Sequence, residues 1–115
     1  MSTDCLFCKI RDVQIPATVT YRDEHVLAFK DIGAKAPFHE LVIPLRHVAT
    51  LADASPTDVE LYGQMVVAGA ARARASGLAA NGFRVVMNAG PDAGQSVFHV
   101  HLHVLAGRTL AWPPG

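Results

Sequence analysis

The chain has 115 residues, with ten Lys plus Arg against ten Asp plus Glu and a formal net charge of zero. A chain of this length forms one domain with a core of its own, so we expect a single domain over residues 1–115. The balanced charge, without a basic run, argues against nucleic acid or an anionic membrane as the partner. Half of the residues are hydrophobic and 17% are charged, which leaves apolar surface that a second subunit could cover.

The N-terminal residues Met1 to Cys5 lack the basic stretch and apolar segment of a secretion signal, and no apolar run reaches the roughly 20 residues of a membrane span. We therefore expect a cytoplasmic protein. In a reducing compartment the spacing Cys-x-x-Cys of Cys5 and Cys8 indicates metal ligation or redox chemistry rather than a structural disulfide. The spacing alone leaves both alternatives open.

Strands dominate the first half of the chain. Val19–Arg22 and His25–Lys30 are β-type runs on either side of Asp23-Glu24, which predicts a hairpin with a tight turn. Glu40–Pro44 is a third predicted strand, which ends at a proline because proline cannot donate a ladder hydrogen bond.

One long helix is predicted after these strands. Ser55 is a good N-cap, Pro56 suits the first helical position, and Asp58 in the first turn faces the positive end of the helix dipole. Apolar residues then recur at three- and four-residue intervals as far as Ser76. Gly77 is the expected stop, because glycine adopts the left-handed conformation just past a helix at little cost.

The last part of the chain returns to strands. Gly82–Asn88 and Val97–Ala106 are predicted strands, joined by a glycine-bearing loop. A parallel sheet would need a crossover helix between most strand pairs, and only one long helix is predicted. We therefore expect an α+β domain with a five-stranded antiparallel sheet and one main helix on a face.

The most informative stretch is Val97–Leu105, in which His99, His101 and His103 alternate with apolar residues. On a strand, all three imidazoles would project from one face, with neighbouring Cα atoms roughly 7 Å apart and the outer pair roughly 14 Å apart. Two of them could share a metal ion, but not all three. Such a row suits attack on phosphorus by one ring, while others hold a proton or a phosphate oxygen. The alternative is a row of surface histidines, which is less plausible for three in strict alternation.

The alternation His-X-His-X-His, with apolar X, resembles the signature of the histidine triad (HIT) family. Further segments are similar to the Hint branch of that family, and together they cover nearly the whole chain: residues 5–10, Asp31-Ile32 with 36–39, 42–44 with His47, 94–97, and 112–115. The resemblance implies a homodimer in which the two sheets join into a ten-stranded sheet with two nucleotide sites.

The resemblance also implies an activity. His101 would attack the α-phosphate of a purine nucleoside phosphoramidate, such as adenosine 5′-phosphoramidate or AMP-lysine, and form a nucleotidyl-histidine that water then hydrolyses. Conjugates of AMP or GMP would be the ligands. Two alternatives remain: a dinucleoside polyphosphate hydrolase using the same histidine, or a zinc-stabilised nucleotide-binding protein with little catalysis.

The resemblance assigns roles residue by residue. His103 and His39 would act beside the transferred phosphate, and Asp31 would accept hydrogen bonds from the ribose hydroxyls. No metal is required for this catalysis, but a structural zinc ion would be held by a separate set of ligands. The nucleotide-binding residues would be Asp31, Ile32, Asn88, Gly94, Gln95, Ser96, His101 and His103, and the zinc ligands would be Cys5, Cys8, His47 and His99.

Two segments near the expected site depart from the family pattern. Ala93 stands where glycine is frequent, and Gly33-Ala34-Lys35 replaces a segment that usually carries proline. We expect neither to touch a proposed catalytic residue, but both adjoin the expected site and leave the substrate preference open.

Overall fold

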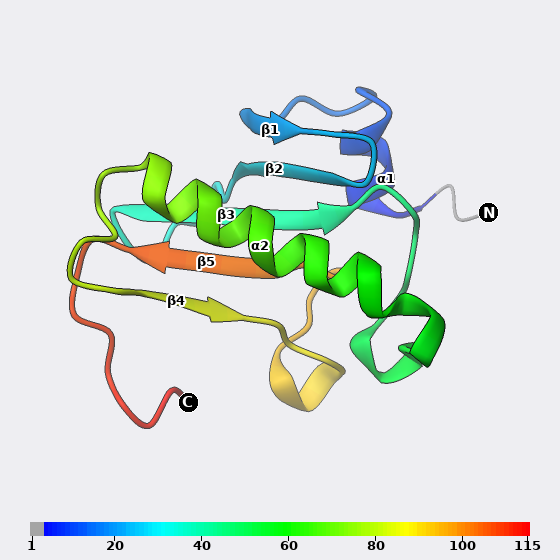
Figure 1. Cartoon of the computed structure of the whole chain (residues 1–115). Helices are drawn as coiled ribbons and strands as arrows, with labels where there is room; N and C mark the ends of the chain where they lie inside the picture. The colour runs from blue at the N-terminus through cyan, green and yellow to red at the C-terminus, as the bar shows by residue number, and fades with distance from the viewer. Residues whose placement is uncertain (1–3) are drawn as a thin grey trace.

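The structure, a computed structural model, describes residues 4–115; the first three residues, on which part of the expectation about a secretion signal rests, lie outside the described range. Within that range, five strands form one antiparallel sheet in the order β1-β2-β3-β5-β4 (Figure 1). No helix of the described chain is long and apolar enough to cross a membrane. The strands are β1 (Val19–Arg22), β2 (Val26–Lys30), β3 (Phe38–Pro44), β4 (Phe83–Val86) and β5 (Leu102–Ala106).

Helices cover both faces of this sheet. The long helix α2 (Val59–Ala75) runs across one face (Figure 1), and the short helix α1 (Leu6–Arg11) packs on the other. Alternate residues of β2 and β3 therefore enter two different cores, which is why both central strands are almost entirely buried. The core under α2 includes Val26, Ala28, Val42, Met65 and Val104; the core under α1 includes Phe7, Leu27, Phe29, Leu41 and Ile43. The expected α+β architecture is confirmed.

The start of the long helix differs from the prediction. A 3₁₀ turn over Pro56–Asp58 precedes the α-helical part. The carboxylate of Asp58 accounts for this turn, because one oxygen accepts the Ser55 N–H at 3.0 Å and the other accepts from Arg46 at 2.6 Å. The predicted stop is confirmed, since Gly77 has a φ of +74°.

The predicted strand Val97–Ala106 is wrong in its first half. Only Leu102–Ala106 pairs in the sheet as β5, and residues 97–101 leave strand geometry. In that segment the Val100 N–H donates to the Val48 carbonyl at 2.7 Å instead of to a ladder partner. The prediction for β4 is also too long, since that strand ends at Val86 rather than Asn88.

Helix α1 was not predicted. It has six residues, which is too short for helix propensity to reveal it. Its start is defined by a side chain, because the Cys5 Sγ accepts a hydrogen bond from the Cys8 N–H at 3.3 Å. The Cys-x-x-Cys spacing therefore places both thiols on the first turn of one helix.

A buried ion pair joins α2 to the sheet. Glu40 on β3 is only 2% exposed and faces α2. Its two carboxylate oxygens accept from Arg72 Nε at 2.9 Å and Arg72 Nη2 at 3.1 Å, and one of them also accepts from the Thr20 hydroxyl at 2.8 Å. This pairing compensates a charge that would otherwise be costly to bury.

The substitution Arg72→Ala should therefore lower the free energy of unfolding by about 3 kcal/mol, because it leaves the Glu40 charge buried without its partner. Urea denaturation of both proteins measures the difference. The matched control is Arg74→Ala on the exposed side of the same helix, which should change stability by less than about 0.5 kcal/mol. Equal losses of stability in the two variants would contradict the conclusion that the Glu40–Arg72 ion pair stabilises the fold.

Candidate active site and metal cluster

The three histidines of residues 99–103 all lie on the side of the sheet that α1 covers, while Val100, Leu102 and Val104 enter the core under α2. His99 and His101 precede β5, and His103 lies within it. The ring of His99 packs against His47, with centroids 5.0 Å apart, while His103 lies 5.1 Å from His101 and 5.2 Å from His39. The expected alternation, with the three imidazoles on one face and the apolar residues buried on the other, is therefore confirmed, although only residues 102–106 pair in the sheet. Along this face the histidines divide between two adjoining groups.

His101 has one ring nitrogen fixed by the backbone. Its Nδ1 lies 2.9 Å from the carbonyl oxygen of His99. A carbonyl oxygen can only accept, so Nδ1 carries the proton and Nε2 keeps its lone pair. The ring is 5% exposed, and the edge of Phe7 packs against it with centroids 5.1 Å apart. In the neutral ring the contact with the His99 carbonyl selects one tautomer, with the proton on Nδ1 and the lone pair on Nε2, as a nucleophile requires.

His39 and His103 form a directed hydrogen-bond chain. The Lys35 N–H donates to His39 Nδ1 at 3.0 Å, so the proton of the neutral His39 ring lies on Nε2. His39 Nε2 in turn lies 2.9 Å from His103 Nδ1 and donates to it. His103 Nδ1 is therefore an acceptor, and its Nε2 presents an N–H.

Asp31, which directly follows β2, is the third member of this group. Its Oδ1 accepts from the Gly33 N–H at 2.7 Å, which shapes the turn after the strand. Its Oδ2 lies 3.3 Å from His39 Nε2 and 4.0 Å from His103 Nδ1. The carboxylate is thus both a turn-forming residue and a neighbour of the two rings.

Burial keeps both rings neutral. Removal from water, together with the neighbouring His101 and His39, lowers the pKa of His103 to about 4, although Asp31 opposes the shift. Burial likewise lowers the pKa of His39, with Asp31 again in opposition. At neutral pH the pair therefore offers hydrogen-bond donors without a positive charge.

Asp31, His39 and His103 each place one potential ligand atom within 4.8 Å of the others, which would suit a metal. The Lys35 amide argues against a metal ion bound by these three residues. It occupies the Nδ1 lone pair of His39 and leaves the proton on Nε2, the atom that faces the other two groups. A protonated nitrogen cannot ligate a metal ion, so these residues act as a hydrogen-bond chain.

The second group consists of Cys5, Cys8, His47 and His99, whose ligand atoms all lie within 4.8 Å of one another. His99 Nδ1 is 3.3 Å from the Cys5 sulfur, 3.5 Å from the Cys8 sulfur and 3.1 Å from His47 Nδ1. These separations match those between neighbouring ligands around a small tetrahedral ion with two sulfurs and two nitrogens. The four residues could therefore hold a metal ion.

The chemistry of the donors agrees with this geometry. His99 is fully buried, and its Nε2 donates to the Pro44 carbonyl at 2.8 Å, so the lone pair lies on Nδ1, which faces the sulfurs. Burial, together with the adjacent Cys5, raises the pKa of Cys8 to about 11. A bound cation reverses this effect, because it favours the thiolates.

The loop before the histidines is held by a side chain expected to bind nucleotide. Gln95 is 4% exposed, and its Oε1 accepts from the Gly90 N–H at 2.9 Å. Its Nε2 donates to the carbonyls of Ala49 at 2.7 Å and Val97 at 3.1 Å. The amide of Gln95 thus shapes the loop, and Gly94, with a φ of +87°, allows the turn that it stabilises.

The remaining expected nucleotide residues are accessible. Ile32 is fully exposed just after Asp31, Ser96 is exposed, and Asn88 is half-buried. An exposed isoleucine beside the ring cluster has no partner in the core of the described chain, which leaves it available to a ligand.

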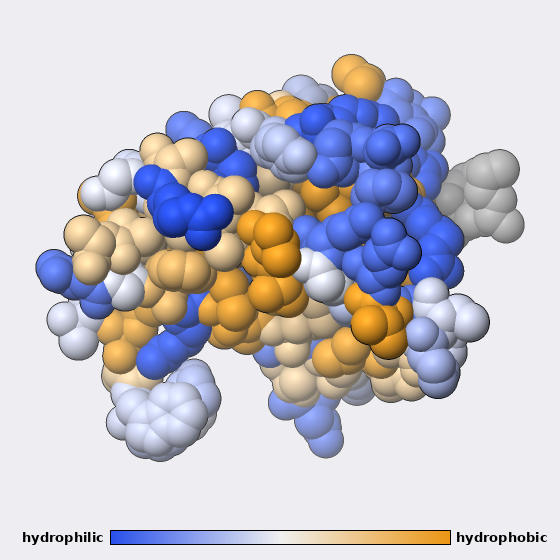
Figure 2. Space-filling view, in the orientation of Figure 1, coloured by the Kyte–Doolittle hydropathy of each residue, from blue (hydrophilic) through white to orange (hydrophobic). Residues whose placement is uncertain are grey.

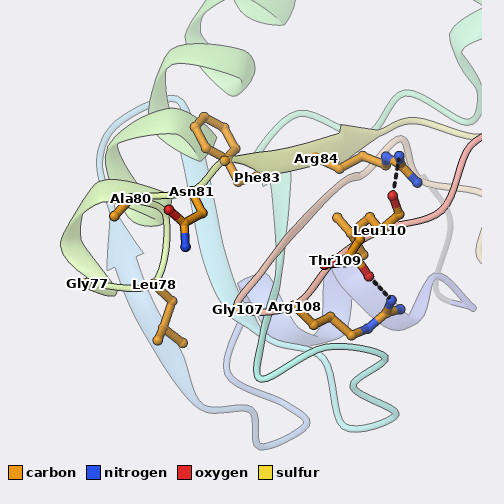
Figure 3. A pocket seen from close by; sticks show the side chains of 11 residues that line it. Gly77, Leu78, Ala80, Asn81, Phe83, Arg84, Gly107, Arg108, Thr109 and Leu110 are labelled. Atoms are coloured by element: carbon orange, nitrogen blue, oxygen red, sulfur yellow. Dashed lines mark hydrogen bonds between the residues drawn. The ribbon is translucent and has the colours of Figure 1, made fainter.

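A cavity of about 650 Å³ is lined by residues from the ranges 77–84 and 107–110 (Figure 3), and none of the residues expected to act in catalysis or nucleotide binding lines it. Its walls come from the connection between α2 and β4 and from the segment that follows β5. Arg84 donates to the Leu110 carbonyl at 3.4 Å, and Arg108 donates to the Thr109 carbonyl at 2.9 Å. Arg108 Nε also donates to the Lys35 carbonyl at 2.9 Å. The segment after β5 is therefore tied to the turn whose amide orients His39.

The sequence matches the HIT domain family over residues 12–110, and the chain belongs to that family. An uncharacterised HIT-like protein of Synechococcus elongatus is 45% identical over 115 residues, which cover both chains completely. A HIT family hydrolase from Legionella pneumophila has a similar structure, with a TM-score of 0.95 and 46% identity over 97% of this chain and 100% of that one. A histidine triad protein from Clostridium difficile has a TM-score of 0.92 and 40% identity over 96% of each chain.

Three contributors to the two groups escaped the sequence analysis. Two of them are backbone atoms, the Lys35 amide and the Pro44 carbonyl, which no residue pattern reveals. The expectation that the segment Gly33-Ala34-Lys35 touches no proposed catalytic residue is therefore wrong, because the Lys35 amide donates to His39. The third is the ring of Phe7, which supports His101 from between the two cysteines. Its position inside the Cys-x-x-Cys motif was the only available signal.

The pKa of His103 should be measurable as a titration midpoint near pH 4 in ¹⁵N-histidine NMR spectra. The variant Asp31→Asn should lower it further, because the carboxylate opposes the shift; Asp12→Asn, whose side chain pairs with Arg11, is the control. Unfolded histidine takes up its proton near pH 6.5, so the free energy of unfolding should fall as pH drops from about 6.5 towards 4. A midpoint near 6.5 would contradict the neutral pair.

Proposed function

We propose that this protein is a nucleotide hydrolase or transferase of the Hint branch, which cleaves purine nucleoside phosphoramidates through a nucleotidyl-histidine on His101. The observation that supports this proposal most is the His99 carbonyl on His101 Nδ1, which leaves the Nε2 lone pair free. The name of the Legionella pneumophila relative, a hydrolase, supports the reaction class. Adenosine 5′-phosphoramidate or AMP-lysine would be suitable substrates.

In the proposed reaction, His101 Nε2 attacks the α-phosphorus and a new nitrogen–phosphorus bond forms. The bond from phosphorus to the leaving nitrogen breaks, and that nitrogen departs as an amine after taking up one proton from solvent, which the later attack of water returns. The His103 Nε2–H donates a hydrogen bond to a phosphate oxygen, and His39 keeps His103 in the tautomer that can do so. Water then cleaves the nucleotidyl-histidine, which releases the nucleoside monophosphate and restores the neutral His101.

The nucleotide would lie across the ends of β2 and β5. Asp31 would accept from the ribose hydroxyls through Oδ2, since Oδ1 is already engaged by Gly33. Ile32 would contact the base. The loop from Asn88 to Ser96, including Gly94 and the backbone of Gln95, would bind the phosphate, because glycines let backbone N–H groups approach an anion.

Incubation with adenosine 5′-phosphoramidate should release AMP, and His101→Ala should lower the rate by roughly 10³-fold or more without unfolding the protein. Mass spectrometry of an acid-quenched reaction should find the nucleotide on a peptide covering residues 97–105. His25→Ala is the matched control, because His25 lies outside both histidine groups.

Other outcomes would redirect the proposal. Faster cleavage of a dinucleoside polyphosphate would favour the sister activity, in which the same histidine expels a different leaving group. Tight AMP binding without turnover or adduct would favour a binding protein. Full activity of His101→Ala would remove the nucleophile assignment.

We also propose that the ion held by Cys5, Cys8, His47 and His99 is a structural zinc, the metal that prefers two sulfurs and two imidazoles in a closed tetrahedral site. When bound, it would neutralise the thiolates and cross-link α1 to the segment before β5. The proposed catalytic steps use the chain's own imidazoles and assign the ion no part.

The protein should act as a homodimer in which two sheets join at their β4 edges. β4 pairs with β5 alone among the described strands. Phe83 and Val85 on this edge are 40% and 39% exposed, and Val66 on α2 is 47% exposed. Figure 2 shows apolar side chains gathered along α2 and towards this edge. Such a surface is typical of a subunit interface.

The variant Val85→Lys should convert the dimer to a monomer in sedimentation velocity, because a charge on the joining edge opposes pairing. Val19→Lys, at the opposite edge on β1 where Val19 is 49% exposed, is the matched control and should remain dimeric. A monomeric unsubstituted protein, or dimers of both variants, would refute pairing through β4.

A further inference from the structure

The candidate metal cluster and the candidate nucleophile share one residue, His99. Its ring lies among Cys5, Cys8 and His47, while its main-chain carbonyl accepts the Nδ1 proton of His101 at 2.9 Å. The position of that carbonyl therefore depends on where the ring is anchored. Whatever holds the His99 ring also determines which nitrogen of His101 carries the proton.

A second contact joins the same two groups. Phe7 lies between the cysteines on α1, and its ring packs edge-on against both histidines, with centroids 6.1 Å from His99 and 5.1 Å from His101. The interplanar angle with His101 is 88°. Helix α1 is short, and the cysteine pair is what fixes its first turn. The cluster thus holds the ring that supports His101.

Residues 97–101 have few other supports. They lie outside the sheet, so no ladder of hydrogen bonds fixes the His99 carbonyl. The contacts that hold them are the His99 ring on the Pro44 carbonyl at 2.8 Å, the Val100 N–H on the Val48 carbonyl at 2.7 Å, and the amide of Gln95 on the Val97 carbonyl at 3.1 Å. On the α1 side, the contacts with Cys5, Cys8 and His47 hold the His99 ring.

We propose that the cluster of Cys5, Cys8, His47 and His99 is a positioning device for His101. An intact cluster fixes the His99 carbonyl and the Phe7 ring, and these two groups hold His101 as the Nδ1–H tautomer aimed for attack. This inference deepens the proposed function, because it takes His101 as the nucleophile. Phe7 and His99 are positioning residues, which act through His101 and touch no substrate.

The test compares three forms of the full chain labelled with ¹⁵N-histidine: protein loaded with Zn²⁺, the same protein reduced and stripped with a chelator, and Phe7→Leu loaded with Zn²⁺. Metal content is measured in each. The ¹⁵N spectrum reports the tautomer of His101, rapid quench reports the rate of nucleotidyl-His101 formation, and calorimetry reports the Kd for AMP.

The matched control is Phe29→Leu. Phe29 lies in the same core and packs against Phe7 with centroids 5.5 Å apart, so this substitution removes the same volume of aromatic ring from the same core. It should keep the His101 tautomer and the adduct rate of the unsubstituted protein. Circular dichroism and thermal unfolding confirm that every form compared is folded.

In the loaded protein, His101 should give one Nδ1–H tautomer. The stripped protein should show mixed tautomers and an adduct rate lower by about 10-fold or more, since small misplacements of a reacting group cost factors of this order. The Kd for AMP should change by less than about twofold. Phe7→Leu should retain its metal and lose rate in the same way.

An unchanged His101 tautomer and adduct rate in both the stripped protein and Phe7→Leu would overturn the inference. Equal losses in Phe7→Leu and Phe29→Leu would also overturn it, because the effect would then be general core damage. If the unsubstituted protein forms no adduct, the proposed function fails; the tautomer comparison still decides whether the cluster positions His101.

Discussion

The candidate site depends on one constraint, which is that a carbonyl oxygen can only accept a hydrogen bond. The His99 carbonyl fixes the tautomer of His101, and the Pro44 carbonyl fixes that of His99. At His39 the constraint is reversed, because the backbone N–H of Lys35 can only donate and so fixes the tautomer of His39. Three backbone atoms therefore decide which nitrogen of each of these neutral imidazoles carries the proton and which keeps a lone pair.

Because their tautomers are fixed, the histidines of the two groups present different ring nitrogens, some with a lone pair and some with a proton, to their neighbours. The lone pair of His99 faces two sulfurs, whereas the lone pair of His101 lies on the nitrogen opposite its backbone contact. His39 and His103 present N–H groups and are kept neutral by burial. A metal-binding group and a hydrogen-bonding group can therefore lie side by side, and neither takes over the role of the other.

The sequence predicted most of the sheet because apolar runs and turn residues report strand pairing directly. It failed at residues 97–101, where alternation satisfied the strand pattern but Val100 found a partner in Val48 outside the sheet. The short helix at Leu6–Arg11 was missed for a related reason, since a thiol cap and not helix propensity defines its start.

The metal cluster also joins parts of the chain that are made at very different times. Cys8 is separated from His47 by 39 positions and from His99 by 91. At typical synthesis rates of roughly 5–20 residues per second, the second interval alone takes roughly 5–18 s. Throughout that interval the two thiols have at most one imidazole of the cluster available, so the four side chains can come together only after nearly the whole chain has been made.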